Sequence, residues 1–313
     1  MHLKGTDLNL LVALEALLTE KSVTLAAERL HVTQPAMSNA LKRIRDRFGD
    51  EILVRNGRSL ELTPAAQTMI FPLQEILAQA EALLNVGSAF DPMTARKTFR
   101  IMMSDYCADI LLPPISKALS QLAPNIKCEV DFLNNKALYR LWSGDVDLCV
   151  TPQDLRLVDP SFKAGSFQRK EIFKDRFVCV VATSNPATRG GLDGETYRTS
   201  PHVCVRFGDG TISMDEQAKK QLGLDTKIIV PTVATLTKVV PGTDIIATVP
   251  ERLVRDTRHL EGMKVLPCPL EIPEIVETMS WHPRADHDPS HSWFRQVMID
   301  ASAKLPPIGA LAT

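Results

Sequence analysis

The stretch from Thr33 to Arg58 constrains the fold more than any other part of the sequence. Thr33 is suited to cap a helix, and Pro35 falls in the first turn of that helix, where a missing N–H has no cost. One face of the helix is apolar and consists of Met37, Leu41, Ile44 and Phe48. Asn56 and Gly57 follow as a strong hairpin signal, because both central residues of such a turn need positive φ. The sequence therefore predicts an amphipathic helix followed directly by a two-stranded hairpin.

Two shorter helices are expected before this unit. Apolar residues recur at helical spacing from Asp7 to Thr19, and Asp7 stands at the N-cap position. A second helix is expected from about Ser22 or Thr24 to Leu30, and its alanines allow close packing of a neighbouring helix. A hairpin that follows such a helix-turn-helix is a wing. Residues 1–62 are therefore predicted to form an all-α winged helix-turn-helix domain.

The exposed face of the third helix has the composition of a DNA-recognition helix. It begins with small and amide side chains and ends with cations, among them Arg45. Between Lys42 and Arg58 there are six basic and three acidic residues, although the formal net charge of the whole chain is -1. Such a charge run is often only a solvated face, but here it coincides with a recognition helix and a wing. The residues expected to contact DNA are Ser22, Thr24, Thr33, Gln34, Pro35, Ser38, Asn39, Lys42, Arg43, Arg55 and Arg58.

A long helix is expected to begin at Thr63 and Pro64 and to run to about Val86. Its apolar residues repeat at heptad spacing, which is typical of a helix that packs against a partner helix. The predicted dimerisation residues are Met69, Leu73, Ile76, Ala80 and Leu83. Residues 63–87 are therefore predicted to be a linker helix that joins two copies of the chain, and a dimer reads two half-sites on DNA.

From Lys97 onward the pattern changes to short strands that alternate with helices. This alternation predicts an α/β domain with mostly parallel strand pairing. In open α/β sheets, ligands bind beyond the carboxyl ends of the strands. An α/β domain is therefore predicted over residues 88–313, and any ligand site in it is expected at these strand ends.

Several function classes lack their sequence signals. The motifs GxSxG, HExxH, GxxxxGK[ST] and GxGxxG after a strand are absent, so no catalytic residue, cofactor or metal site is expected. No secretory signal and no uninterrupted run of about 18 apolar residues occurs, which indicates a cytoplasmic protein without a membrane span. The six cysteines form no CxxC pair, and buried reduced thiols are expected, with a redox-active pair as the alternative.

A family resemblance becomes specific over the first ninety residues. Residues 26–55 resemble the core motif of the LysR-type DNA-binding domain, with the sequence AAERLHVTQPAMSNALKRIRDRFGDEILVR. Two further segments resemble one branch of this family, which contains the nodulation regulators and the aromatic-acid-responsive naphthalene and nitrotoluene regulators. They are LKGTDLNLLVALEAL and SAFDPMTARKTFRIMMSDY. This resemblance implies a two-subdomain effector domain like that of periplasmic binding proteins, with a cleft between the subdomains. Subdomain I is expected at about 96–182 and 284–304, and subdomain II at about 183–283.

The resemblance also implies an effector pocket. Ser104 follows the first strand at a position that lines the pocket in this family, and His202 aligns with a pocket histidine of the aromatic-acid regulators. Thr232 stands where those regulators have a second histidine, which argues against a salicylate-like ligand. Tyr106 is expected to stack on the ligand, Arg206 to hold an anion and Trp281 to form an aromatic wall. The predicted effector-binding residues are Ser104, Asp105, Tyr106, Thr151, His202, Arg206, Thr232 and Trp281.

The resemblance implies a transcription activator that a small aromatic effector controls. Its expected partners are double-stranded promoter DNA, RNA polymerase and further copies of itself, as a homodimer or homotetramer. The expected pathway is the degradation of aromatic or chlorinated aromatic compounds, and the nodulation-like opening keeps flavonoids as candidate effectors. Two alternatives remain, namely a thiol-redox-sensing regulator or repressor of the same architecture, and an enzyme on a binding-protein-like fold.

Overall fold

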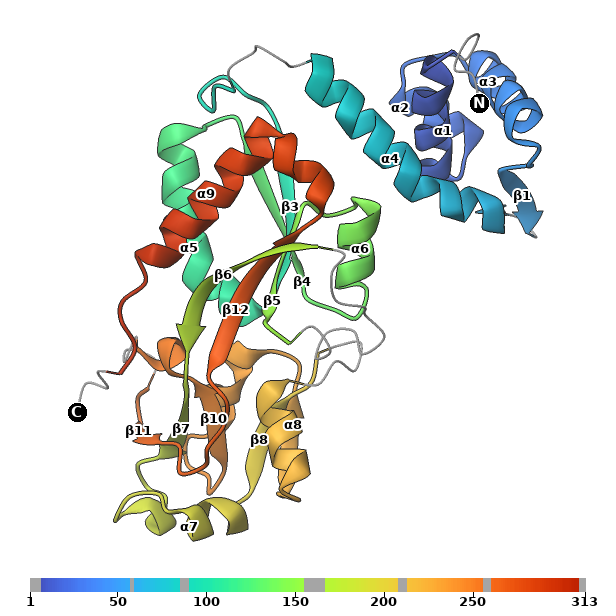
Figure 1. The fold of residues 1–313 in the computed structure, drawn as a ribbon. Coiled ribbons are helices and arrows are strands. Elements are labelled where there is room, and N and C mark those ends of the chain that lie inside the picture. Colours follow the sequence, from blue (N-terminus) through green and yellow to red (C-terminus); the bar gives the residue numbers. More distant parts are fainter. Residues whose placement is uncertain are drawn as a thin grey trace. The chain divides into compact units, whose positions relative to one another are not determined.

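The computed structural model describes residues 7–56, 59–84, 90–154, 167–207, 213–255 and 260–309. Contacts between residues divide the chain into two compact units, Met1–Ser88 and Ala89–Thr313. Figure 1 shows helices and one short hairpin in the first unit, and sheets with flanking helices in the second. None of the described helices is both long and apolar enough to cross a membrane.

The first unit contains the predicted helices and hairpin. Its elements are α1 (Asn9–Glu20), α2 (Val23–Arg29), α3 (Gln34–Phe48), β1 (Leu53–Asn56), β2 (Ser59–Leu62) and α4 (Pro64–Leu84). The helix starts follow from side-chain caps, since Ser22 accepts the N–H of Leu25 and Thr33 accepts the N–H of Ala36. Helix α1 begins at Asn9 rather than at Asp7, whose carboxylate accepts the N–H of Asn9 instead.

The core of the first unit brings α4 onto α1. Ala16 of α1, Ala26 of α2 and Ile44 of α3 are fully buried. The small side chains of the two alanines allow the helices to pack closely. Leu73 of α4 is buried in the same core, and α4 packs against α1. The hydroxyl of Thr63 caps α4 by accepting the N–H of Ala66 at 3.0 Å. The long helix therefore starts as part of the first unit.

The described residues of the second unit form two five-stranded sheets. The first sheet has the order β4 (Lys127–Phe132), β3 (Thr98–Met103), β5 (Leu148–Pro152), β12 (Ile275–Trp281) and β6 (Gln168–Asp175). The second has the order β11 (Met263–Pro267), β7 (Phe177–Ala182), β10 (Ile246–Pro250), β8 (His202–Val205) and β9 (Thr226–Val230). The described helices of this unit are α5 (Asp105–Leu122), α6 (Ala137–Ser143), α7 (Gly194–Thr199), α8 (Met214–Gln221) and α9 (Pro289–Ala303), with short 3₁₀ helices η2 (Pro186–Thr188), η3 (Val233–Val239), η4 (Glu251–Val254) and η6 (Pro283–His287).

Both sheets are mixed, so the expectation of mostly parallel pairing was wrong. Parallel pairs join β3 to β4 and β5, and β8 to β9 and β10. The pairs that β12 makes with β5 and β6, and those that β7 makes with β10 and β11, are antiparallel. The antiparallel strands are those that arrive from the other sheet, which alternation of strands and helices does not reveal.

The chain crosses between the sheets at two places in the described part of this unit. It leaves the first sheet at Asp175 and enters the second at Phe177, and it returns between Pro267 and Ile275. The expected subdomain boundaries, after residue 182 and after residue 283, therefore need correction. Strand β7 belongs to the second sheet and β12 to the first, because backbone pairing, and not the apolar pattern, decides which sheet a strand joins.

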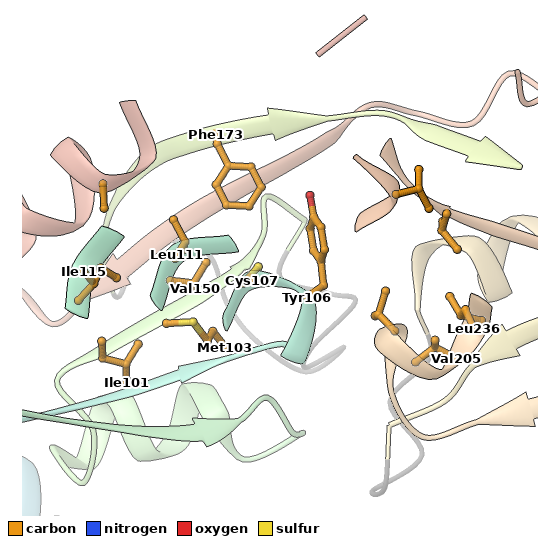
Figure 2. Packing of buried hydrophobic residues seen from close by; sticks show 14 of the residues in the cluster. Ile101, Met103, Tyr106, Cys107, Leu111, Ile115, Val150, Phe173, Val205 and Leu236 are labelled. Atoms are coloured by element: carbon orange, nitrogen blue, oxygen red, sulfur yellow. The ribbon is translucent and has the colours of Figure 1, made fainter. Parts of the chain in front are cut away.

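One apolar core extends across the two sheets. It includes Ile101, Met103 and Leu111 near the first sheet and Val205 and Leu236 near the second, as Figure 2 shows. On the α9 side, the ring of Phe99 stacks on that of Phe294, with ring centroids 4.1 Å apart. The two sheets are therefore held together by packing as well as by the crossing strands.

Candidate functional site

The exposed face of α3 presents the polar residues that were expected there. Met37, Leu41 and Ile44 are buried, which turns the opposite face of the helix to solvent. The exposed residues on and before this helix include Thr33, Gln34, Pro35, Ser38, Asn39, Lys42 and Arg43. In α2, Thr24 is exposed, while the hydroxyl of Ser22 is used as the helix cap. The first turns of α3 therefore carry amide and hydroxyl groups on a free surface.

The cations near this face divide into two groups. Arg45 is half-buried, and its guanidinium donates to the carbonyls of Glu51 at 2.8 Å and Leu53 at 3.1 Å, so it fastens the end of α3 to the hairpin. Its placement on the exposed face was wrong, because these carbonyls satisfy the guanidinium. Arg43 is exposed but forms an ion pair with Asp7 at 3.1 Å. Arg55 is exposed on β1.

The two strands of the predicted wing lie within the described residues. Strands β1 and β2 pair antiparallel, with Asn56 opposite Ser59. Gly57 and Arg58 lie outside the described residues, so the expected phosphate contact of Arg58 stays a prediction.

The heptad stripe of α4 is divided between two environments. Leu73 is buried in the core of the first unit, and Met69 packs against that core. Ile76 is 48% exposed and Leu83 is 73% exposed, and Ala80 is exposed as well. The first part of the predicted seam thus contributes to its own unit, and the later part remains open.

A polar junction lies where the parallel strands of both sheets end. The hydroxyl of Ser104 accepts the N–H of Cys107 and so caps α5. The carboxylate of Asp105 accepts the N–H of Ala234 in η3 at 2.9 Å. Thr232, which follows β9, shares a hydrogen bond with Thr235 at 2.6 Å between the hydroxyl oxygens. Helix α5 follows a strand of the first sheet and η3 follows a strand of the second, so Asp105 joins the two subdomains.

The charged side chains that the structure describes at this junction do not form an anion site. Arg206 follows β8, and its guanidinium is paired with the carboxylate of Glu216. This ion pair argues against the expected role of Arg206 as an anion clamp, because Glu216 already neutralises the charge of the guanidinium. Asp105 and Asp109 place two carboxylates on the first turns of α5, and both burial and the charge of Asp105 raise the pKa of Asp109. Lys238 of η3 opposes them by lowering that pKa.

Three of the predicted effector residues lie in the protein interior, namely Tyr106, Thr151 and His202. Tyr106 is 3% exposed, and its hydroxyl donates to the carboxylate of Asp175, so stacking on a ligand is corrected to a role in the core (Figure 2). A residue in the first turn of α5 that faces the sheet has no free ring surface. Thr151 is fully buried near the end of β5, and its hydroxyl has no hydrogen-bond partner among the described residues.

His202 and Trp281 lie at the opposite ends of their sheets from that junction. His202 begins β8 and pairs with Ile246 and Thr226, which begin the neighbouring strands. It is fully buried against Tyr197, with its Nε2 2.8 Å from the Tyr197 carbonyl. These contacts correct its expected role as a ligand contact to a structural one.

Trp281 ends β12, which runs antiparallel to β5, so it lies beside the start of β5 and not beside its end. The indole N–H donates to Asp286 at 2.7 Å, and the guanidinium of Arg295 lies over the ring at 4.6 Å. The aromatic wall expected from Trp281 is therefore not part of the junction.

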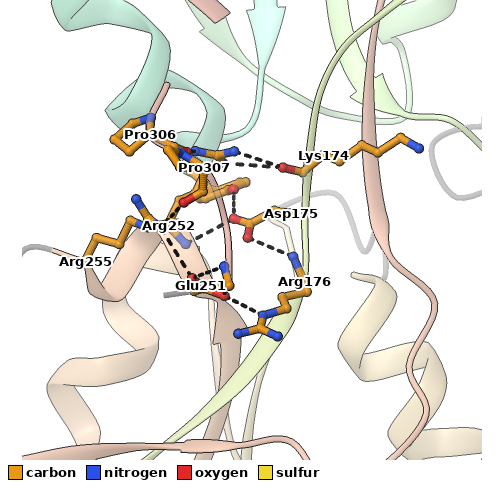
Figure 3. Close-up of polar contacts among 10 residues, drawn as sticks. Lys174, Asp175, Arg176, Glu251, Arg252, Arg255, Pro306 and Pro307 are labelled. Carbon is orange, nitrogen blue, oxygen red and sulfur yellow. Dashed lines mark hydrogen bonds and ion pairs between the residues drawn. The ribbon is translucent and has the colours of Figure 1, made fainter. Parts of the chain in front are cut away.

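Two buried carboxylates close to Tyr106 were missed from the sequence. Asp175 accepts hydrogen bonds from the backbone N–H groups of Arg176 and Arg252 at the first crossover (Figure 3). Glu277 is almost fully buried on β12, its Oε2 has no hydrogen-bond partner among the described residues, and burial raises its pKa to about 7. A carboxylate inside the apolar strand IVETMSW was the available signal.

A shallow apolar groove lies on the outer side of the first sheet. It has a volume of about 560 Å³ and is lined by α5 and the edge strand β4, with Leu112, Leu119, Pro124 and Val130 among its residues. Phe132, at the end of β4, is 66% exposed. No group of His, Cys, Asp or Glu side chains within the described ranges is arranged to hold a metal ion.

Two family models match the chain. Residues 8–67 match the bacterial regulatory helix-turn-helix protein of the lysR family, and residues 94–303 match the LysR substrate binding domain. Nodulation protein D 2 of Rhizobium leguminosarum bv. phaseoli is 31% identical over 312 residues, which cover 97% of this chain and 95% of that protein. Nodulation protein D 1 of Mesorhizobium japonicum is also 31% identical, over 99% of this chain and 97% of that protein.

Solved structures share the fold. A probable transcriptional regulator from Pseudomonas aeruginosa, 25% identical, has a TM-score of 0.61 and covers 95% of this chain and 97% of its own. A full-length OxyR variant from the same organism, 18% identical, has a TM-score of 0.74 over 97% of this chain and 96% of its own. The likeness to OxyR is one of fold alone.

Proposed function

The chain belongs to the LysR family of bacterial transcription regulators, and from that premise we propose that it is an activator whose DNA binding responds to a small aromatic effector. Its helix-turn-helix and its effector-binding domain are the parts that it shares with the family. The observation that carries the proposal is the exposed polar face at the start of α3, which combines a capped helix end with free amide and hydroxyl groups.

The proposed DNA contacts follow from the chemistry of these side chains. Gln34 and Asn39 have amides that pair with adenine in the major groove, and Ser38 lies between them on the exposed face. Lys42 and Arg55 are exposed cations suited to phosphate contacts, which fix the register of the protein on DNA. Base edges thus give the sequence preference, and the cations give salt-dependent affinity.

The proposed assembly is a homodimer, or a homotetramer in which two such dimers associate. Ile76 and Leu83 leave apolar surface on α4, and the groove between α5 and β4 leaves a second such surface on the other unit. A second copy of this chain is the proposed occupant of each. Because one surface lies on each unit, a chain can contact two different copies, and two such two-fold contacts form a closed tetramer if their axes intersect at right angles. Recruitment of RNA polymerase is the proposed output.

The proposed effector binds at the junction of the subdomains, near Ser104 and Thr232. An aromatic carboxylate would meet the carboxylate of Asp105 and would find Arg206 already paired with Glu216. An uncharged hydroxylated aromatic, such as a phenol or a flavonoid, avoids that repulsion and can use the hydroxyl groups. The proposed target genes serve the breakdown of such aromatic compounds.

Ligand control requires that the effector favour one arrangement of the subdomains over another. The contact of Asp105 with Ala234 joins elements that follow strands of different sheets, so a ligand beside it acts on both. A change in subdomain closure then alters the spacing of DNA-binding heads in the assembly. Effector and DNA affinities must change by the same factor, because linkage is reciprocal.

A thermal-shift screen of the full chain against phenols, flavonoids and aromatic acids tests the effector class. A ligand present at 100 times its Kd is expected to stabilise the protein by about 2.7 kcal/mol. Uncharged aromatics should raise the melting temperature and change the DNase footprint on promoter DNA. Stabilisation by aromatic carboxylates alone, or a ligand that leaves the footprint unchanged, would contradict the proposal.

A further inference from the structure

A short segment after α9 connects this helix with the second sheet. Helix α9 packs on the first sheet, where the ring of Phe294 stacks on that of Phe99. Residues 305–309 follow the helix with the sequence LPPIG. Hydrogen bonds join them to η4 and its C-cap, which come directly after β10 of the second sheet (Figure 3). In the described part of this unit, the segment 305–309 therefore adds a link between the sheets to the two crossovers of the chain.

Two arginines bind the segment by its backbone carbonyls. The guanidinium of Arg252 donates to the carbonyl of Pro306 and also, at 3.3 Å, to the carbonyl of Lys174 on β6. The guanidinium of Arg255 donates to the carbonyl of Pro307. Proline has no backbone N–H, so these two residues present acceptors without a donor that needs its own partner. Each ring also fixes φ, which reduces the conformational entropy that the segment loses when it binds. The run of two prolines is therefore suited to a surface of two arginines.

Glu251 of η4 brings the segment and the first crossover to one carboxylate. Its side chain is fully buried and accepts the backbone N–H of Gly309 at 2.9 Å. The guanidinium of Arg176, which lies between β6 and β7, pairs with the same carboxylate, and that of Arg255 lies 3.6 Å from it. A buried charge is costly unless such partners satisfy it. Burial raises the pKa of Glu251, but the bonds from Gly309 and Arg176 outweigh burial and hold this pKa below its usual value. The segment 305–309 therefore completes a site that also binds the crossover.

The segment has little slack, so it opposes rotation of one subdomain against the other. Helix α9 ends at Ala303, and only Lys304 and Leu305 separate that end from the bonded carbonyl of Pro306. Three residues of fully extended chain span at most about 11 Å. Leu305 also packs against the apolar core that the two sheets share. A rotation that moves η4 away from α9 must therefore break the bonds to the segment.

We propose that residues 305–309 are a strap that holds the two subdomains in one arrangement, and that release of the strap changes DNA binding. An effector that favours another arrangement must offset the free energy of the bonds that the strap loses, so the strap sets how strongly the chain responds. The strap itself rests on the contacts above, whereas its effect on DNA binding rests on the proposed function. The two parts therefore need separate experiments.

The first experiment compares backbone hydrogen exchange of the complete chain with that of a variant that lacks residues 306–313. The N–H of Glu251 donates to the carbonyl of Arg176 at 2.9 Å. The N–H of Arg252 donates to the carboxylate of Asp175 at 3.1 Å, so both amides report on the contact of η4 with the crossover. Exchange in η4 should be at least tenfold faster in the variant, with no change in β3 of the first sheet. Unchanged exchange in η4, or the same acceleration in β3, would overturn the strap.

The second experiment removes one arginine and leaves the segment in place. Arg255→Ala should accelerate exchange in η4 at least threefold in the complete chain, because the bond to Pro307 is lost. In the variant that lacks residues 306–313 the same substitution should have a much smaller effect, since its partner is already gone. Arg189→Ala, which changes an exposed arginine of the same unit, should leave the exchange of both chains unchanged. Equal acceleration by Arg255→Ala in the two chains would show that Arg255 does not act through the strap.

The third experiment measures binding of the same chains to an operator selected from a randomised duplex pool. The variant that lacks residues 306–313 should differ from the complete chain at least fivefold in affinity, Arg255→Ala should change affinity in the same direction, and Arg189→Ala should not change it. If exchange in η4 rises while operator affinity stays the same, the effect of the strap on DNA binding is refuted. If the complete chain selects no operator, the proposed function is what fails, and the exchange measurements still decide whether the strap exists.

Discussion

The carboxylate of Asp105 accepts the backbone N–H of Ala234 at 2.9 Å, which ties the first turn of α5 to the start of η3. A carboxylate is favoured at the N-terminal end of a helix, because it compensates the partial positive charge there. The same carboxylate takes the position that an anionic ligand would otherwise occupy. Asp105 therefore both joins the subdomains and sets the charge of the proposed effector site.

Removal of this carboxylate tests both roles. Asp105→Ala should lower the free energy of unfolding by about 1–3 kcal/mol, because a hydrogen bond to a charged group is lost. Asp105→Asn keeps a hydrogen-bond acceptor, so its free energy of unfolding should fall by less. The affinity of this variant for aromatic carboxylates should rise, because the negative charge is gone. Urea denaturation and calorimetry measure the two effects. Asp300→Ala, an exposed residue on α9, is the control, and a loss as small as in that control would contradict the account.

Glu277 predicts an unusual dependence of stability on pH. Its native pKa of about 7 lies above the ordinary value of 4.5, so between these values the folded chain holds a proton that the unfolded chain has released. Protonated Glu277 therefore contributes to the free energy of unfolding in full below pH 4.5, and this contribution is lost as the pH rises through 7. The total loss is about 3 kcal/mol. Glu277→Gln should therefore be the more stable protein at pH 8, by an amount of that order.

Denaturation of the wild type and Glu277→Gln from pH 5 to pH 8 measures this difference. Glu171→Gln, an exposed residue on the neighbouring strand β6, should show no comparable change. Parallel pH profiles for the wild type and Glu277→Gln would mean that the carboxyl is not buried as described.

The end of α6 predicts a stability effect of backbone and packing together. Gly144 has φ +84°, and a Cβ placed there would contact the guanidinium of Arg284, which donates to the carbonyl of Trp142 at 3.2 Å. Gly144→Ala should cost about 2–3 kcal/mol, since strain at positive φ and displacement of Arg284 add. Gly242, with φ +70° and open space around it, isolates the strain, and Gly242→Ala should cost about 1 kcal/mol. Equal losses in the two variants, measured by thermal unfolding, would exclude the clash.

The local elements could be predicted because their signals are local. The cap at Thr33, the apolar face of α3 and the turn residues after β1 all act within a few positions of the chain. The role of Arg45 was not predictable in this way, because the carbonyls that it binds become available only when the hairpin folds back.

The effector residues show where sequence reasoning stops. Ser104 and Asp105 follow β3 directly, so their place at a strand end could be foreseen. His202 and Trp281 were misplaced because strand direction decides which end of the sheet they reach, and direction depends on pairing with distant segments.

In the proposed mode of binding, the exposed face of α3 reads DNA sequence while Arg55 contacts phosphate. The most direct measurement is the salt dependence of binding of the full chain to an operator selected from a randomised duplex pool. Arg55→Ala should reduce the slope of log K against log salt by about 0.9 and weaken binding to all sequences. Ser38→Ala should keep the slope and change base preference, and Lys117→Ala, an exposed cation on α5, should do neither. If Ser38→Ala and Arg55→Ala both bind the operator as the wild type does, the account of DNA recognition is wrong.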